Sequence, residues 1–154
     1  MYTKEEAASI KKEFWTAFGQ YMSLHPSAEG IKVNWINYRT GIKDVIFRTD
    51  VISRQTYIGI ELHHQDEGIR ELFFEQFLEL RTYLHSIMGE EWIWQESYTN
   101  PDNGKTISRI FADRHGFTLF NRDHWPDIIS FLKPRLIKLD EFWGDAKYSF
   151  DALK

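Results

Sequence analysis

Residues 56–89 read TYIGIELHHQDEGIRELFFEQFLELRTYLHSIMG, and within this run the hydrophobic period changes from two to about 3.6. The first part alternates, which puts Ile58 and Ile60 on one face of a predicted strand. The second part repeats apolar residues at helical spacing from Asp66, a favourable N-cap, to Gly89, the residue type that ends helices in the left-handed conformation. The run therefore predicts a strand that leads directly into one long, largely covered helix.

The chain has 154 residues and contains no cysteine. A chain of this length without a linker-like stretch is most simply one domain, residues 1–154, which can fold without disulfides. The absence of cysteine excludes thiol catalysis and cysteine-ligated zinc, and it is typical of a reducing compartment. The N-terminus lacks the apolar stretch of a secretory signal, and no apolar run approaches the roughly 20 residues of a membrane span. The sequence thus predicts a cytoplasmic protein that does not enter a membrane.

The net charge and the aromatic content of the chain indicate what kind of partner it binds. The net charge is -4, from 19 basic and 23 acidic residues, so no basic excess draws the protein to a phosphate backbone. Aromatic residues make up 16% of the chain, including six Trp and twelve Phe. We interpret this content as a large core, a buried interface, or both. We therefore expect self-association, with the last helix or the hairpin over residues 92–111 at the contact.

Further elements are predicted before the central strand. A capping box at Thr3 and apolar residues at helical spacing predict a first helix over about residues 4–23. A short strand is predicted around residues 31–35. Residues 45–51 alternate as a half-buried strand, and a tight turn at residues 53–54 joins them to the central strand as a hairpin.

After the long helix, two strands over about residues 92–98 and 105–111 flank residues 100–104, NPDNG, which are rich in turn-forming types. A short strand is predicted at residues 117–120 and a last helix over about residues 123–143.

Pro134 lies inside that last helical pattern. Because proline removes one backbone hydrogen bond, we expect it to kink the helix or to divide it in two. The order of elements predicts an α+β fold, in which an antiparallel or mixed sheet of about five to six strands packs against three helices.

The first hairpin register predicts one polar face. If residues 52–55 form its loop, Asp44, Arg48, Glu61 and His63 share the face away from the apolar core. Two acids and a histidine could hold a divalent metal for phosphodiester cleavage. However, His63 stands where active nucleases of the restriction-enzyme type usually carry lysine. We therefore favour a solvated or salt-bridged sheet face, and we expect neither a metal nor a cofactor there.

The second hairpin register predicts an aromatic and guanidinium surface. If residues 99–104 form its loop, Trp94 faces Arg109 and Trp92 faces Phe111. Such a cluster could stack nucleic-acid bases. Because the chain is net negative and has no basic stripe, we favour a core or dimer surface, in which Arg109 is structural.

Several short motifs carry a family resemblance. They are Phe14-Trp15, residues 59–62 (GIEL), residues 89–94 (GEEWIW), residues 108–110 (SRI) and residues 123–125 (DHW). In them the chain resembles, over most of its length, the bacterial family catalogued as domain of unknown function 4268. Longer members carry a similar domain behind a nuclease-like module, which implies an association with DNA-processing or defence systems. The family has no established catalytic residues, so the resemblance implies one ordered domain and assigns no site.

These patterns predict a small α+β domain that acts by binding rather than by catalysis, with a protein partner or a second copy of the chain as its ligand. The alternative is a metal-dependent phosphodiesterase with a restriction-endonuclease-like arrangement of strands. Nucleic acid is the less favoured partner.

Overall fold

The computed structural model describes residues 2–154. Its main elements are α1 (Lys4–Met22), β1 (Val45–Ile52), β2 (Gln55–Leu62), α2 (Glu67–Glu79), α3 (Arg81–Met88), β3 (Ile93–Thr99), β4 (Thr106–His115) and α4 (Trp125–Ala146). Short 3-10 turns, η1 (Arg122–His124) and η2 (Lys147–Phe150), flank α4. Within this described part of the chain, no helix combines the length and apolar character needed to cross a membrane.

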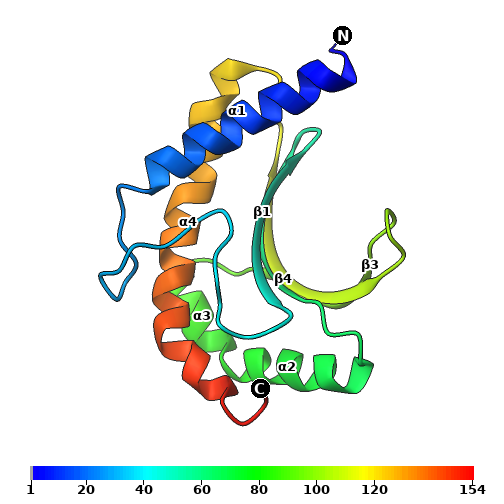
Figure 1. The fold of residues 1–154 in the computed structure, drawn as a ribbon. Helices are drawn as coiled ribbons and strands as arrows, with labels where there is room; N and C mark the ends of the chain where they lie inside the picture. Colours follow the sequence, from blue (N-terminus) through cyan, green and yellow to red (C-terminus); the bar gives the residue numbers. More distant parts are fainter. Residues whose placement is uncertain (1) are drawn as a thin grey trace.

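The four strands form one antiparallel sheet in the order β1-β2-β4-β3. Figure 1 shows the sheet bending into a trough, with the helices on its convex side and its concave side open. Alternation along β2 explains the two sides, because Ile58, Ile60 and Leu62 are fully buried toward the helices. The α+β class and the antiparallel sheet are confirmed.

The predicted register of the first hairpin is confirmed. Ile46 pairs with Glu61 and Arg48 with Gly59 around a two-residue turn. Because the pairing is uninterrupted, alternation decides which side of the sheet each side chain faces in both strands. Val45 and Phe47 therefore join the core, while Arg48 faces the concave side.

The predicted long helix over residues 66–89 is wrong, because Leu80 divides it into α2 and α3. Its ends are as predicted: the Asp66 side chain accepts a hydrogen bond from the Ile69 N–H, and Gly89 adopts a φ of 71°. The Leu80 N–H bonds to the carbonyls of residues 77 and 78 in a tightened turn. This break lets α2 pass beneath the sheet while α3 packs along α4 (Figure 1).

Two predicted short strands are absent, which is why the sheet has four strands rather than five or six. Residues 31–35 lie in an irregular loop, where the Asn34 side chain accepts hydrogen bonds from the Ile36 and Asn37 N–H groups. Such a local turn competes with strand formation. Residues 117–120 also turn, because the Thr118 N–H donates to His124 and the Leu119 carbonyl accepts from a Trp indole.

Pro134 does not divide the last helix, since α4 runs unbroken from Trp125 to Ala146. Pro134 and Ser130 are both exposed. Water can therefore hydrate the Ser130 carbonyl that loses its partner, which makes the missing bond less costly.

The domain covers its aromatic residues by itself. Among residues 2–154 no Trp or Phe is exposed, and only the tyrosines Tyr2, Tyr21 and Tyr148 are. Trp143 of α4 and Trp92 lie in the core rather than on a contact surface. The aromatic content therefore gives no reason to expect a second subunit.

Candidate functional site on the concave face of the sheet

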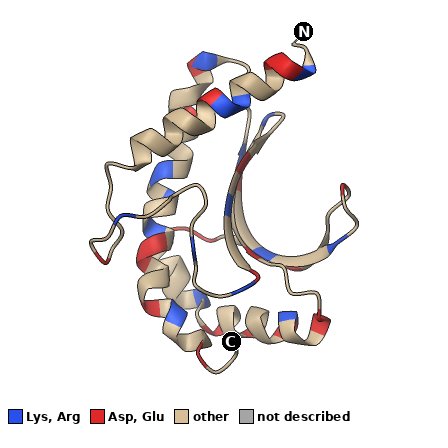
Figure 2. Cartoon of the chain, viewed as in Figure 1, with Lys and Arg blue, Asp and Glu red and all other residues tan. Residues whose placement is uncertain are grey.

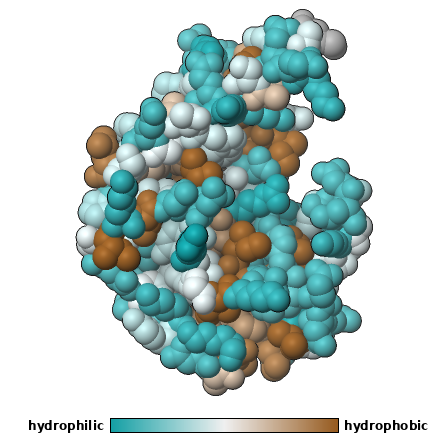
Figure 3. Space-filling view, in the orientation of Figure 1, coloured by the Kyte–Doolittle hydropathy of each residue, from teal (hydrophilic) through white to brown (hydrophobic). Residues whose placement is uncertain are grey.

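A groove of about 390 Å³ lies over the concave face, between β1 and β2 on one side and the β3–β4 hairpin on the other. Figure 3 shows the surface hollowed beside this hairpin. The strands point mainly polar and aromatic side chains into the groove, together with Ile52 and Ile107, because most of their apolar side chains face the helices.

Glu61 is the buried carboxylate of this face, with only 5% of its surface exposed. Its Oε2 accepts a hydrogen bond from the Tyr57 hydroxyl at 2.8 Å, and its Oε1 lies 2.8 Å from His63 Nε2. All three residues come from β2 or its end and follow at intervals of two or four, so alternation places them on one face. The carboxylate is held by neighbours on both oxygens.

Gly59 allows this contact between side chains four residues apart. The Tyr57 ring lies along the strand over Gly59, where an added Cβ would come within 2.4 Å of Tyr57 Oη and 3.0 Å of Phe111 Cβ. Any other residue at this position would push the Tyr57 ring away from Glu61.

The protonation of this group follows from its contacts. Burial acts to raise the pKa of Glu61, but hydrogen bonds from His63 and Tyr57 and the charge of Arg48 outweigh it and lower the pKa. Burial, together with the Glu61 charge, raises the pKa of Tyr57. At neutral pH the pair is thus a carboxylate and a neutral phenol, an acceptor and a donor that are already bonded to each other.

Arg109 forms the second cluster of the groove. Its Cζ lies 3.6 Å from the ring centroid of Tyr98 and 4.2 Å from that of Phe111, and its Nε donates to Gln95 Oε1 at 2.6 Å. The guanidinium is thus held among aromatic rings while staying partly exposed. Such a group is fixed in position before a ligand arrives.

The predicted register of the second hairpin is wrong by one residue. Gln95, not Trp94, pairs with Arg109, and Ile93, not Trp92, pairs with Phe111. A bulge between Gln95 and Tyr98 inserts one extra residue into β3. Because side chains alternate, this shift turns Trp94 to the opposite side of the sheet.

The predicted aromatic and guanidinium surface is therefore divided. Arg109 and Phe111 lie on the concave face, whereas Trp94 packs edge-on against Phe74 of α2 at 5.9 Å. Trp92 is buried, and its indole donates to Glu90. The ring that replaces Trp94 against Arg109 is Tyr98, because the bulge separates the faces of these two residues and leaves only Tyr98 on the Arg109 side.

The predicted polar face is partly assembled. Arg48, Glu61 and His63 line the groove, but Asp44 does not. Asp44 precedes β1 with a φ of 69°, so strand alternation does not extend to it. Arg48 pairs with Asp50 at 2.9 Å rather than with Glu61. Residues 2–154 contain no group of three His, Asp or Glu residues placed to share a metal ion.

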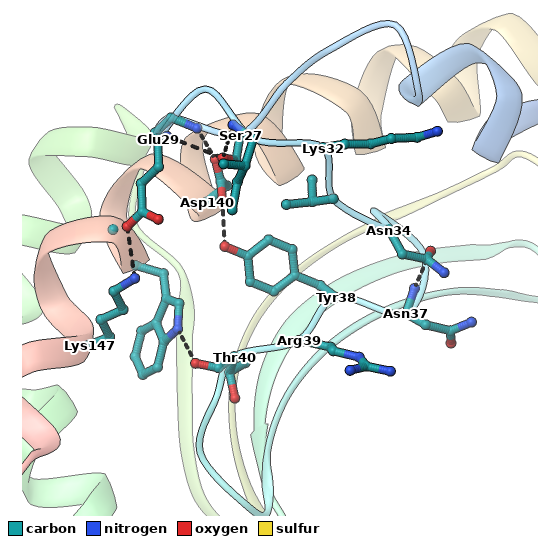
Figure 4. Close-up of a pocket in the computed structure, with 15 residues that line it drawn as sticks. Ser27, Glu29, Lys32, Asn34, Asn37, Tyr38, Arg39, Thr40, Asp140 and Lys147 are labelled. Atoms are coloured by element: carbon teal, nitrogen blue, oxygen red, sulfur yellow. Dashed lines mark hydrogen bonds and ion pairs between the residues drawn. The ribbon is translucent and has the colours of Figure 1, made fainter.

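A larger cavity of about 640 Å³ lies between α4 and the loop over residues 23–44. Figure 4 shows its polar groups pointing at one another: Asp140 accepts from the Tyr38 hydroxyl and Ala28 N–H, and Lys147 pairs with Glu29. Burial and Asp140 raise the pKa of Tyr38, which stays a neutral donor. These contacts attach the loop to the helix, so we interpret the polar groups of this cavity as structural rather than as a ligand site.

Charge is balanced over the molecule. Figure 2 shows Lys and Arg interspersed with Asp and Glu along the helices and strands. The groove itself has three basic residues (Arg48, Lys105, Arg109) and three acidic ones (Asp50, Glu61, Asp102). It therefore has no excess positive charge for a phosphate backbone.

Stability should fall on acidification in two steps. Burial lowers the pKa of His64 from its ordinary 6.5, so the unfolded chain takes up a proton first and stability is lost as the pH falls below about 6.5. The lowered pKa of Glu61 adds a loss below about 4.5. Melting temperatures measured from about pH 2 to pH 8 check both steps. Because His64 stacks on Phe73 at 4.2 Å, His64→Phe should keep that packing and remove the first step; an unchanged first step in this variant would contradict the assignment.

Comparison with known proteins gives a family and no function. A family model described as "Domain of unknown function (DUF4268)" matches residues 10–147, most of the chain. No curated protein and no solved structure matches.

Proposed function

The chain belongs to the DUF4268 family, and we propose that it is a non-catalytic interaction module whose concave sheet face binds a segment of a partner protein. One observation carries this proposal: Arg109 and Tyr98 line an open groove, where the Arg109 side chain is held against the rings of Tyr98 and of the buried Phe111. Arg and Tyr are the residue types that dominate binding energy at protein interfaces when neighbouring groups hold them in place.

The rest of the groove supports a protein ligand. Ile52, Pro101 and Ile107 add apolar surface, while the charges of both signs at its rim can pair with either sign on a partner. A binding domain beside a nuclease-like module would bring that module to a partner, so the link to DNA-processing or defence systems is part of this proposal.

The phosphodiesterase alternative receives less support. Both oxygens of Glu61 already accept hydrogen bonds, and Asp44 lies outside the groove. A metal-dependent hydrolase needs convergent oxygen ligands and a group that manages the proton of the attacking water. The arrangement around Glu61 would have to come apart before it could supply them.

The test compares Arg109→Ala with Arg114→Ala. Arg114 is a matched control because it lies on the same strand, faces the other side of the sheet and also contacts a ring, Phe117, at 5.0 Å. Each variant and the wild type serve as bait in cells of the source species. A captured protein is then purified and titrated against each bait by calorimetry.

We expect Arg109→Ala to lose about 1 to 3 kcal/mol of folding stability through lost stacking, so binding is measured well below its melting temperature. Arg109→Ala should weaken binding at least about tenfold, and Arg114→Ala should bind as the wild type does. Equal affinity of all three baits would refute the concave face as the binding surface. Light scattering at high micromolar concentration tests the other candidate partner, a second copy of the chain.

A further inference from the structure

The outer edge of β1 carries backbone groups without partners. The His63 N–H donates to the Asp44 carbonyl at 2.8 Å, and the Gly116 N–H donates to the Arg54 carbonyl at 2.9 Å. In an antiparallel ladder, alternate residues direct both backbone groups at the same neighbour. The first bond shows that Asp44 directs its backbone groups at β2, and by alternation so does Arg48. Phe47 and Thr49 occupy the positions between, so their N–H and C=O groups point away from β2.

Three of the outward groups at the ends of this edge are already satisfied within the chain. The Val45 N–H donates to the Ile42 carbonyl, and the Val45 carbonyl accepts from the Thr40 hydroxyl. The Val51 N–H donates to the Asp50 side chain. Between them, no hydrogen bond from residues 2–154 reaches the outward groups of Phe47 and Thr49. Two donors and two acceptors thus remain in the middle of the strand.

A groove of about 460 Å³ runs beside this edge along residues 46–50. Its opposite wall contains Trp15 of α1 and Ile36 of the loop, both of which pack partly buried against the core. Five residues of strand span roughly 13 Å, the length of a short extended peptide. Because Trp15 and Ile36 stand beside the edge, an incoming chain would have to fit within this volume, which suits a single extended segment better than the edge of a second whole sheet.

The β1 edge also lacks several of the usual protections against pairing. Proteins commonly place proline, lysine or a bulge on an exposed edge strand. The sequence of β1 is VIFRTDVI, without proline or lysine, and its pairing with β2 has no register shift. The other edge of the sheet, β3, contains the bulge after Gln95.

We propose that the β1 edge binds an extended segment of a partner protein, which adds to the sheet as a fifth strand. Backbone groups of the segment pair with Phe47 and Thr49, and apolar side chains at alternate positions face Trp15 and Ile36. The inference rests on the backbone geometry of β1 and not on the concave groove, so either surface can fail its test without the other.

The test uses a phage-displayed library of random linear peptides, selected on the whole protein. Thr49→Pro removes one outward N–H at an edge position that tolerates proline. Thr49→Val keeps the N–H and the branched shape, and it removes a hydroxyl that is buried without a partner. This pair of variants separates the backbone contact from the side chain.

We expect selected peptides to carry apolar residues at alternate positions. They should bind wild type and Thr49→Val equally and Thr49→Pro at least about tenfold more weakly. Methylation of the peptide amides that face β1 should have the same effect. If Thr49→Pro does not fold, hydrogen exchange in the wild type decides, because bound peptide should protect the Phe47 and Thr49 amides.

Several results would overturn the proposal. The first is a selection that yields no peptide, and the second is a set of peptides that bind without protecting these amides. The third is a set of peptides whose binding is weakened by Arg109→Ala and not by Thr49→Pro. The last is a wild-type dimer that Thr49→Pro makes monomeric. The third would place the peptide in the concave groove, and the last would show a second copy at the edge.

Discussion

Gly59→Ala is expected to destabilise the protein by on the order of 2 to 4 kcal/mol. The new methyl group would lie 2.4 Å from Tyr57 Oη, and the backbone of a central strand cannot move to avoid it. The Tyr57 ring must therefore rotate away. Its departure removes one of the two hydrogen bonds on a carboxylate that is 5% exposed, so part of the loss is the unpaired charge of Glu61.

Chemical denaturation measures this loss, and Gly144→Ala provides the control. Gly144 lies in α4, and an added Cβ there meets nothing within 4 Å. Alanine is the better helix former, so this substitution should stabilise the protein by about 0.5 to 1 kcal/mol. The double variant Gly59→Ala with Tyr57→Phe should lose less than the sum of the single changes, because the shortest contact is with the hydroxyl; the contact with the Tyr57 Cζ at 2.8 Å stays and keeps part of the loss. Wild-type stability in Gly59→Ala would show that the Tyr57 ring does not lie over Gly59.

How far the sequence predicts the site depends on the regularity of each strand pair. β1 and β2 alternate without interruption around a two-residue turn, so counting residues places Arg48 opposite Gly59 and Glu61 on the concave face. The same alternation places Tyr57 on the concave face, although the predicted polar face did not include it. In the second hairpin a bulge changes the count by one, and nothing in its local sequence marks the inserted residue.

Elements held by distant side chains were equally hidden from the sequence. The loop over residues 23–44 contains apolar residues that resemble a strand, but its hydrogen bonds go to α4 and to its own turns. The division of the long helix at Leu80 keeps the apolar period on both sides, so the period gives no sign of it. In both places tertiary packing decides between conformations that local preference leaves similar in free energy.

Asp140→Ala should also lower stability strongly, by about 3 kcal/mol. Asp140 is 5% exposed, and its carboxylate accepts hydrogen bonds from the Tyr38 hydroxyl and from the Ala28 N–H at 2.7 Å. Alanine would leave both donors without a partner in a largely covered place. The loop over residues 23–44, which has no regular secondary structure, would lose a main attachment to α4. In the variant, the amides of this loop should then exchange hydrogen faster than they do in the wild type, while those of the sheet should change less.

Asp145→Ala on the same helix is the matched control, because Asp145 also accepts a hydrogen bond from a tyrosine hydroxyl, that of Tyr83 at 2.9 Å. That contact is exposed, so water can replace the carboxylate and the change should stay within about 0.5 kcal/mol. Asp140→Asn should fall between the two, since the two donors bind different carboxylate oxygens and asparagine keeps an oxygen at only one of these positions, with an NH₂ group at the other. Equal losses for Asp140→Ala and Asp145→Ala would mean that the loop is held by its other contacts, such as the Trp143 indole bonded to the Thr40 carbonyl.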